Sequence, residues 1–243
     1  MRLCRHKIAA RPGRGAYHLR RRAQAGLSSR RLIMELLIFG ASGATGRVLV
    51  QAALAEGHAV SAFVRTPGKL AIRHERLTVI VGDVADRQAV ERTVAGHDAV
   101  LSCLGVGVPL KHDPAVVAGI GFIVDALQRT GPARLIYLSF LGVHDSRHQL
   151  GLLLGGIVVP LLLRHEVADH EAKERLIVQS GLDWTIVRPP KLSNGAATGR
   201  LRHDNGIHAK PLLPTMARAD VAAFMLGQVG DTTYSRKAVS LLH

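Results

Sequence analysis

The sequence predicts a doubly wound α/β fold of the Rossmann type, a single domain with one parallel sheet and helices on both of its faces. Three observations support this prediction. Apolar runs that suit buried strands alternate with helical patterns along most of the 243 residues. These runs are continuous rather than alternating, which is typical of parallel strands covered on both faces. A glycine-rich turn, GASGATG at residues 40–46, directly follows the first run.

The glycine-rich turn joins a strand predicted at residues 36–39 to a helical pattern at 48–54. This order of strand, turn and helix is typical of a dinucleotide-binding unit. Gly40 would let the chain leave the strand sharply, Gly43 would let the backbone approach a pyrophosphate, and Gly46 would let helix and strand pack closely. N–H groups at the start of the helix would then face the anion. We therefore expect a bound nucleotide at this turn, with an ordinary turn as the alternative.

The remaining elements follow in order along the chain. The predicted strands are 58–64, 77–81, 99–105, 134–139, 184–188 and 237–242, and the predicted helices are 86–95, 114–129, 167–180 and 218–226. Right-handed crossovers place the carboxyl ends of parallel strands at one edge of the sheet. Ligands bind at this edge where the strand order reverses. The loops expected to line this crevice are 40–46, 103–108 and 139–144.

Two segments stand outside the alternating pattern. Residues 151–163 are apolar but contain Pro160, and the segment is too short to span a bilayer. We expect a buried or partner-facing helix there, with membrane or dimer contact as the alternative. Residues 191–216 are rich in Gly, Asn and Pro, which predicts a loop on the substrate side.

The net charge of +14 is unevenly distributed. Residues 1–33 hold nine Arg and one Lys and no acidic residue, so the folded domain predicted at 34–243 is only mildly basic. No nucleic-acid partner is expected for this domain. Residues 1–33, here called the basic leader, contain no apolar run, so a secretory signal is not expected. We expect this leader to be disordered or to lie upstream of a true start at Met34, with a transit peptide or a nucleic-acid-binding arm as alternatives.

The two cysteines, Cys4 and Cys103, are far apart and indicate neither a disulfide framework nor a metal site. A reducing, cytoplasmic compartment is therefore expected. His144, Asp145 and His148 lie in one loop without a matching distal set, so no metal is expected either. We expect a monomer or a homodimer, with a small-molecule acceptor as the partner and no membrane association.

The tip of the second strand bears on the choice of cofactor. An acidic residue at this position selects NAD, whereas an Arg accommodates the 2′-phosphate of NADP. The tip residue is Arg65, with Lys69 close by and no acidic residue between them. We therefore expect NADP(H) in preference to NAD(H), with a solvated basic turn as the alternative.

Several of these motifs, taken together, resemble a known family. They are GASGATG at 40–46, Val64-Arg65, VGDV at 81–84 and SGLDWTIVRP at 180–189. In this order and spacing the chain, over residues 34–243, resembles the atypical short-chain dehydrogenase/reductases. Within these it is most similar to the NAD(P)H-binding proteins related to flavin reductase and biliverdin-IXβ reductase, and to the nitrogen-metabolite-regulator-like group.

The resemblance implies roles for the residues that match the family's motifs. The pyrophosphate turn corresponds to Gly40, Ser42, Gly43, Ala44, Thr45 and Gly46. Arg65 corresponds to the contact with the 2′-phosphate, and Asp83 and Val84 correspond to the contact with adenine. The loop on the adenine-ribose and nicotinamide side corresponds to Cys103, Leu104 and Gly105. The residues implied near the nicotinamide are Ser139 and Pro189, and His170 falls where flavin reductase-like members carry a histidine.

One departure from the family matters for the chemistry. Short-chain dehydrogenases that interconvert alcohols and ketones use a Tyr as proton donor and a Lys four residues later that lowers its pKa. The best counterparts are Asp169 and Lys173, so an acid stands in place of the Tyr, and none of the tyrosines 17, 137 and 234 has a Lys four residues on. This favours an NADPH-dependent reductase whose acceptor, a flavin, quinone or bilin-like molecule, takes hydride directly. The alternative is a non-catalytic, NADP(H)-sensing regulator that acts through a protein partner.

The candidate catalytic residues are Ser139, His170 and Lys173. Ser139 would orient the nicotinamide amide or the acceptor, or else bond to its own backbone. His170 would donate a proton or contact the substrate, although a surface histidine is the favoured interpretation. Lys173 would contact the nicotinamide ribose or pair with Asp169. Cys103 is expected to be a small buried residue rather than a nucleophile.

Overall fold

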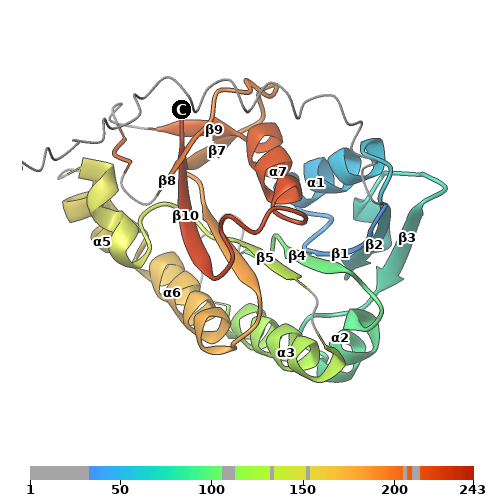
Figure 1. Cartoon of the computed structure of the whole chain (residues 1–243). Helices are drawn as coiled ribbons and strands as arrows, with labels where there is room; N and C mark the ends of the chain where they lie inside the picture. The colour runs from blue at the N-terminus through green and yellow to red at the C-terminus, as the bar shows by residue number, and fades with distance from the viewer. Residues whose placement is uncertain (1–32, 106–112, 132–133, 152–153, 205–206, 210–213) are drawn as a thin grey trace, which may run out of the picture. The chain divides into compact units, whose positions relative to one another are not determined.

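The computed structural model describes residues 33–105, 113–131, 134–151, 154–204, 207–209 and 214–243. Ile33–His243 form one compact unit. Except for Ile33, the basic leader predicted at 1–33 lies outside the described residues, as do 106–108 of the predicted crevice loops. The compact unit is built around an eight-stranded sheet with helices on both faces (Figure 1).

The strand order of the sheet is β3-β2-β1-β4-β5-β6-β10-β8. The strands are β1 Glu35–Phe39, β2 Ala59–Val64, β3 Leu77–Val81, β4 Ala99–Ser102, β5 Arg134–Leu138, β6 Trp184–Arg188, β10 Lys237–Leu242 and β8 Arg202–Asp204. Neighbouring strands are parallel except β10 and β8, which are antiparallel. The doubly wound α/β fold is therefore confirmed, and the prediction of a wholly parallel sheet is wrong at this one edge.

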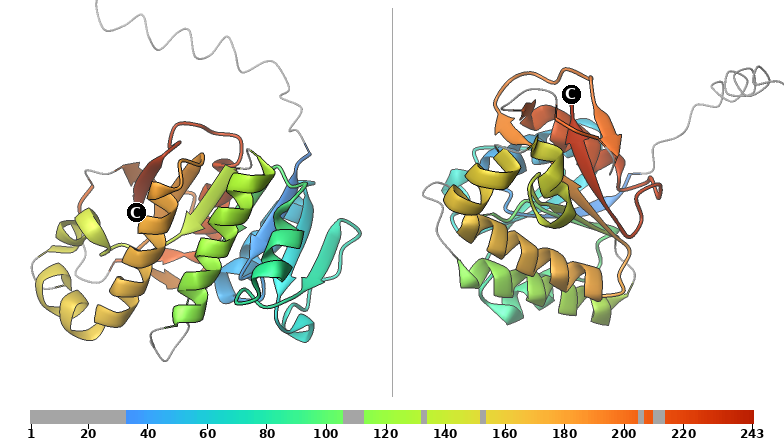
Figure 2. Two further views of the ribbon diagram at one scale, coloured as in Figure 1. Left: turned by 90° about the horizontal axis from the view of Figure 1, so that it is seen from below. Right: turned by 90° about the vertical axis from the view of Figure 1, so that its left-hand side faces the viewer.

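Helices cover both faces of the sheet. One face carries α1 Ala44–Ala55 and α7 Arg218–Gly227, and the other carries α2 Arg87–Val94, α3 Pro114–Thr130 and α6 Arg164–Gln179 (Figures 1 and 2). Along β1, Leu36 and Ile38 pack in the first layer, and Leu37 and Phe39 pack in the second. Both faces of this strand are buried, which explains why its apolar run is continuous.

Two predictions about the second half of the chain need correction: the start of the helix predicted at 167–180 and the loop predicted at 191–216. The helix predicted at 151–163 is present, because every described residue from 151 to 162 is helical, with a π-helical turn at Leu154–Val158 continuing into α5 Val159–Leu162. A 3₁₀ segment at His144–Leu150 precedes it. Pro160 is the second residue of α5. The next helix, α6, begins at Arg164 rather than at residue 167.

The segment predicted as a substrate-side loop, 191–216, contains short strands. They are β8, which pairs with β10, and β7 Lys191–Ser193, which pairs in parallel with β9 Thr215–Ala217. The Asp220 carboxylate at the start of α7 accepts main-chain N–H bonds of 2.9–3.0 Å from Thr198 and Gly199. Bonds between residues more than twenty positions apart thus hold this segment, and local composition does not encode them.

The sheet order reverses beside β1, which lies between β2 and β4. At the carboxyl ends of the strands, Phe39 pairs with Ser102, and Ser102 pairs with Tyr137. The loops that follow β1, β4 and β5 therefore leave the sheet at neighbouring points of one edge. This is the edge at which ligands bind in open α/β sheets.

Candidate functional site

The glycine-rich turn after β1 is shaped by two close backbone approaches. Gly40 has a φ of +72°, and a β-carbon there would lie 2.7 Å from the carbonyl oxygen of Cys103. A β-carbon at Gly46 would lie 2.1 Å from the carbonyl oxygen of Gly40. Any side chain at either position would push the turn away from the end of β4 or from α1. The close packing expected of Gly46 is thus made against the turn itself.

The first turn of α1 faces the same edge. Gly43 is its N-cap and provides no side-chain hydrogen bond, while the Gly43 N–H closes the turn by donating to the Gly40 carbonyl at 2.9 Å. Ala44 is exposed, and Thr45 and Gly46 are buried. Main-chain N–H groups at such a helix end carry partial positive charge and suit an anion such as a pyrophosphate. The turn therefore fits the phosphates of a dinucleotide.

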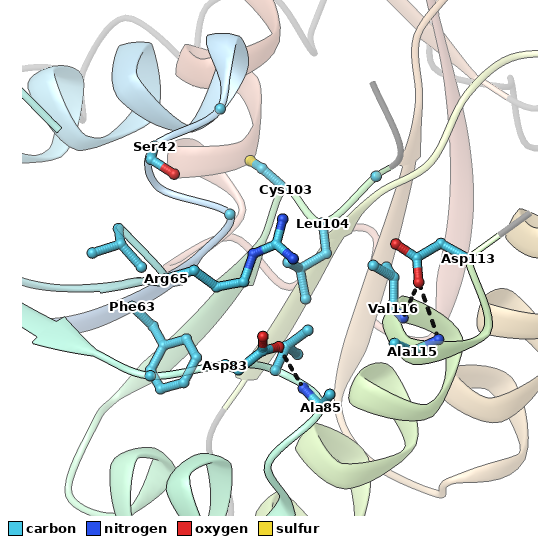
Figure 3. Close-up of a pocket in the computed structure, with 16 residues that line it drawn as sticks. Ser42, Phe63, Arg65, Asp83, Ala85, Cys103, Leu104, Asp113, Ala115 and Val116 are labelled. Atoms are coloured by element: carbon cyan, nitrogen blue, oxygen red, sulfur yellow. Dashed lines mark hydrogen bonds between the residues drawn. The ribbon is translucent and has the colours of Figure 1, made fainter. Parts of the chain in front are cut away.

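A cleft of about 360 Å³ lies at the carboxyl ends of β1 to β4 (Figure 3). Its lining includes most of the residues that the sequence assigned to cofactor binding: Gly40, Ser42, Gly43, Arg65, Asp83, Val84, Cys103, Leu104 and Gly105. The Asp83 carboxylate also accepts the Ala85 N–H at 3.0 Å, which fixes the turn after β3. Residues from four strand ends thus meet in one place, as the strand topology requires.

A second hollow, of about 300 Å³, shares Ser42 and Arg65 with this cleft. Thr66 and Lys69 complete its lining. The turn from the end of β2 into a short 3₁₀ segment at Pro67–Lys69 carries Arg65 and Lys69, and both side chains are exposed. In Figure 3 the Arg65 side chain extends from the end of β2 into the cleft. The lining of this hollow therefore holds two cations and no carboxylate among the described residues.

The sequence did not identify the wall that α3 contributes to the cleft. Asp113, Ala115 and Val116 line it, and the Asp113 carboxylate caps α3 by accepting N–H bonds from Ala115 at 3.1 Å and Val116 at 3.3 Å. An Asp directly before Pro114 is a helix-start signal that could have found this residue. The other lining residues to which the sequence assigned no role are Phe63, Val64, Gly82 and Ala85.

The three candidate catalytic residues do not line this cleft, but they gather beside it. Ser139, His170 and Lys173 are all buried, between the end of β5 and α6. His170 is only 6% exposed, so the favoured interpretation of a surface histidine is wrong. Its Nδ1 lies 2.9 Å from the Tyr137 hydroxyl and 3.3 Å from Ser139 Oγ. The Ser139 hydroxyl thus lies within hydrogen-bonding distance of a side chain on another element.

A main-chain bond connects this cluster with the cleft. The Asp113 N–H donates to the Asp169 carboxylate at 3.1 Å, and Asp113 itself lines the cleft. Asp169 precedes His170 on α6, so this part of the helix is tied to the rim of the cleft. The structure therefore brings the two sets of predicted residues next to each other without merging them into one cavity.

Burial perturbs the ionisation of the cluster. Burial lowers the pKa of Lys173 to about 8, against the attraction of nearby carboxylates, chiefly that of Asp169. Burial also lowers the pKa of His170 well below its ordinary value, and the charge of Lys173 lowers it further. Burial raises the pKa of Tyr137 well above its ordinary value. It also raises the pKa of Cys103 to about 12, which leaves this thiol protonated and unreactive at neutral pH.

A buried ion pair joins the same helix to β6. Arg188 at the end of β6 donates to both carboxylate oxygens of Glu174, at 3.1 and 2.6 Å, and to Asp145 at 2.6 Å. The main-chain N–H of Leu141 donates to the carbonyl oxygen of Pro189 at 2.7 Å and ties the loop after β5 to β6. Pro189, implied to lie over the nicotinamide, is thus buried beside that loop and does not line the cleft.

The loop residues considered as metal ligands have other neighbours. His144 Nε2 lies 3.8 Å from Glu174, Asp145 pairs with Arg188, and the His148 ring packs against His208 at 5.8 Å. Across the described ranges, His, Cys, Asp and Glu side chains form no group of three that could hold a metal ion. In the same part of the chain no helix combines the length and apolarity needed to cross a membrane.

Comparison with curated proteins finds reductases among the relatives. A (4-alkanoyl-5-oxo-2,5-dihydrofuran-3-yl)methyl phosphate reductase from Streptomyces griseus is 29% identical over 154 residues, which cover 63% of this chain and 46% of that protein. A 2-alkyl-3-oxoalkanoate reductase from Stenotrophomonas maltophilia is 33% identical over 197 residues, which cover 70% of this chain and 58% of that protein. The chain thus spans about half the length of these relatives.

Solved structures share the fold. ChuY from Escherichia coli O157:H7, described as an anaerobilin reductase, superposes with a TM-score of 0.71 at 24% identity, covering 86% of this chain and 96% of ChuY. A model of the NAD(P)H-binding family matches residues 40–232, from the first glycine of the turn to beyond α7. The matched segment contains the whole lining of the cleft. The chain therefore belongs to the NAD(P)H-binding family. The curated relatives that it matches include reductases.

Proposed function

We propose that this protein is an NADPH-dependent reductase that delivers hydride to a conjugated acceptor such as a flavin, a quinone or a bilin. The observation that carries the choice of NADPH is the basic hollow lined by Ser42, Arg65, Thr66 and Lys69. It adjoins the dinucleotide cleft at the end of β2, where the 2′-phosphate of NADP is bound in Rossmann folds. An Arg fork and a Lys ammonium suit this phosphate dianion.

The geometry of the glycine turn supports a dinucleotide in the cleft. The close approaches at Gly40 and Gly46 keep side chains out of the space before α1. The uncapped N–H groups of the first helical turn then face a pyrophosphate. When bound, the reduced nicotinamide supplies the hydride, and this chain's residues hold and orient the reactants.

The surroundings of α6 support an acceptor that needs little help with its proton. In place of a tyrosine, the helix carries Asp169, whose carboxylate accepts the Asp113 N–H at 3.1 Å. Burial keeps the proton on the Tyr137 hydroxyl, whose pKa is raised, and leaves His170, whose pKa is lowered, without its acidic second proton near pH 7, so neither side chain is a ready proton donor. A conjugated acceptor can take hydride first and its proton from water afterwards, so correct placement of two rings provides much of the acceleration.

The acceptor is tested by following NADPH oxidation by absorbance with FMN, a quinone and biliverdin offered in turn. A 2-alkyl-3-oxoalkanoate is added to the panel because it is the substrate named for the Stenotrophomonas relative. We expect turnover with at least one conjugated acceptor and none with the keto acid. Turnover with the keto acid alone would contradict the proposed acceptor class.

Two controls make the result decisive. An Arg65→Asp variant purified in parallel should lose activity at low NADPH, whereas a contaminating reductase would be unaffected. NADPH binding is measured by calorimetry in the same preparations. Tight NADPH binding without turnover on any acceptor would favour the alternative function, a non-catalytic NADP(H) sensor that signals through a partner.

A further inference from the structure

Tyr137 and His170 form a buried pair that the assigned roles leave unexplained. Tyr137 is fully buried on β5, and its hydroxyl lies 2.9 Å from Nδ1 of His170. Ser139, two residues further and therefore on the same side of the chain, places its Oγ at 3.3 Å from the same nitrogen. The Phe140 ring stands edge-on to the imidazole, with the ring centres 5.1 Å apart. These contacts hold the imidazole in one orientation.

The protonation of the pair follows from burial. Burial raises the pKa of Tyr137 and lowers that of His170, so near pH 7 the phenol keeps its proton and the imidazole carries only one. A neutral imidazole has one nitrogen that donates and one that accepts. Within the described part of the chain, the recorded partner of the Tyr137 hydroxyl is Nδ1. A buried O–H without an acceptor is costly, so the tyrosine donates to Nδ1 and the imidazole proton stays on Nε2.

We propose that Tyr137 is a positioning residue that holds His170 in its Nε2–H form. His170 is 6% exposed and does not line the cleft, but it lies next to the cleft and keeps a neutral N–H donor on Nε2. This donor binds an oxygen of a reactant that extends past the cleft toward α6. It orients that oxygen and does not protonate it. The tie between Asp113 and Asp169 sets this stretch of α6 at the rim of the cleft. The functional half of this inference rests on the proposed reductase activity, whereas the tautomer does not.

The tautomer is tested by NMR on the full chain labelled with ¹⁵N-histidine, in the absence of nucleotide. The His170 signals are assigned by their loss in a His170→Asn variant. We expect the protonated nitrogen to be Nε2 in the wild-type protein. Tyr137→Phe retains the ring and removes only the hydroxyl, and we expect it to yield a mixture of both tautomers. Ser139→Ala is the matched control, because its longer contact at 3.3 Å should leave the Nε2–H form dominant.

Two results would overturn the positioning role. One is a wild-type His170 protonated on Nδ1, and the other is a Tyr137→Phe protein that folds and keeps the wild-type tautomer. Thermal unfolding of each variant shows whether it folds. If the Phe variant fails to fold, the wild-type tautomer still tests the positioning role, because a proton on Nδ1 would contradict it.

The donor role is tested by two amide substitutions of His170. His170→Gln places an amide N–H near the position of Nε2, whereas His170→Asn places its amide near Nδ1, facing Tyr137. We expect the Gln variant to keep NADPH-dependent turnover within about tenfold of wild type and the Asn variant to lose about 10- to 100-fold. NADPH dissociation constants are measured alongside, so the comparison stands even if no acceptor is turned over. If the Gln and Asn variants have the same turnover and the same NADPH dissociation constant, the donor role is refuted. If the wild-type protein turns over no acceptor, only the proposed reductase activity is refuted.

Discussion

Replacing Arg65 by glutamine removes one of the two cations of the basic hollow and changes little else. The side chain is exposed at the end of β2 and extends into the cleft (Figure 3). Gln retains polarity and much of the length, so the substitution isolates the charge. We expect weaker binding of NADPH and nearly unchanged binding of NADH, because only NADPH carries the 2′-phosphate.

The magnitude follows from the exposure of the site. A hydrogen bond to a charged group contributes about 1.5–3 kcal/mol. Because Arg65 is exposed and Lys69 remains beside it, the lower part of this range applies, about 1.5–2 kcal/mol or roughly a 10- to 30-fold change in Kd. Arg65→Asp adds repulsion of about 1–2 kcal/mol for an exposed pair of like charges. Both effects should shrink as the salt concentration rises.

Calorimetric titration with NADPH and with NADH measures the effect for each variant. Arg73→Gln is the matched control, since Arg73 is also exposed but lines neither the cleft nor the hollow. The fluorescence of Trp184 is suited to following unfolding rather than nucleotide binding, because this side chain does not line the cleft. Trp184 begins β6, at the edge of the sheet opposite the cleft, and is 6% exposed.

Two outcomes would refute the reasoning. If Arg65→Gln weakens NADPH and NADH equally, Arg65 binds a part common to both nucleotides, and the hollow is not a 2′-phosphate site. If neither affinity changes while Arg65→Asp is also silent, the basic turn is merely solvated. A wild-type protein that prefers NADH would contradict the assignment before any substitution is made.

Three further predictions concern stability and are measured by urea denaturation. Gly46→Ala should destabilise the protein by about 1–3 kcal/mol, because its β-carbon would lie 2.1 Å from a carbonyl oxygen of the turn, whereas Gly230→Ala meets no atom within 4 Å and should be close to neutral. Arg188→Met should lower the free energy of unfolding by about 3–5 kcal/mol, because it leaves the Glu174 carboxylate buried without its partner. Adding Glu174→Met should recover much of this loss. A loss below about 1 kcal/mol for Arg188→Met alone would contradict this reasoning. The pKa of Lys173 is about 8 in the folded protein and 10.5 in the reference state, so the unfolded chain binds more protons between these values and stability from this group rises with pH. Relative to Lys173→Met, the wild type should gain up to about 3 kcal/mol between pH 7.5 and 10.5, and a flat difference would show that the lysine is not desolvated.

Local patterns predicted the first βα unit and much of the cleft lining at the ends of β1 to β4, but not the wall from α3. Continuous apolar runs, three glycines and the helix that follows depend on neighbours in sequence, so they could be interpreted one segment at a time. Arg65 directly follows β2, and Asp83 follows β3 after one glycine. Parallel topology then puts both at one edge of the sheet, and the structure gathers them in the same cleft.

The buried polar face of α6 could not be predicted in this way. Asp169, His170, Lys173 and Glu174 are all buried, whereas a helical pattern places charged residues at the surface. His170 therefore looked like one more surface histidine. Its actual contacts, with Tyr137 on β5, join residues 33 positions apart and arise only when the helix packs on the sheet.

By itself the sequence determined the strand–turn–helix unit, the doubly wound order and a basic residue at the end of the second strand, because each depends on chain geometry over a few residues. The tertiary structure alone decided that Ser42, Arg65 and Lys69 share one hollow, that Asp113 lines the cleft, and that the Tyr137 hydroxyl meets His170. The physical reason is that side chains from separate elements meet only once the helices are seated on the sheet. Burial then changes the chemistry of those side chains in ways that no local pattern carries.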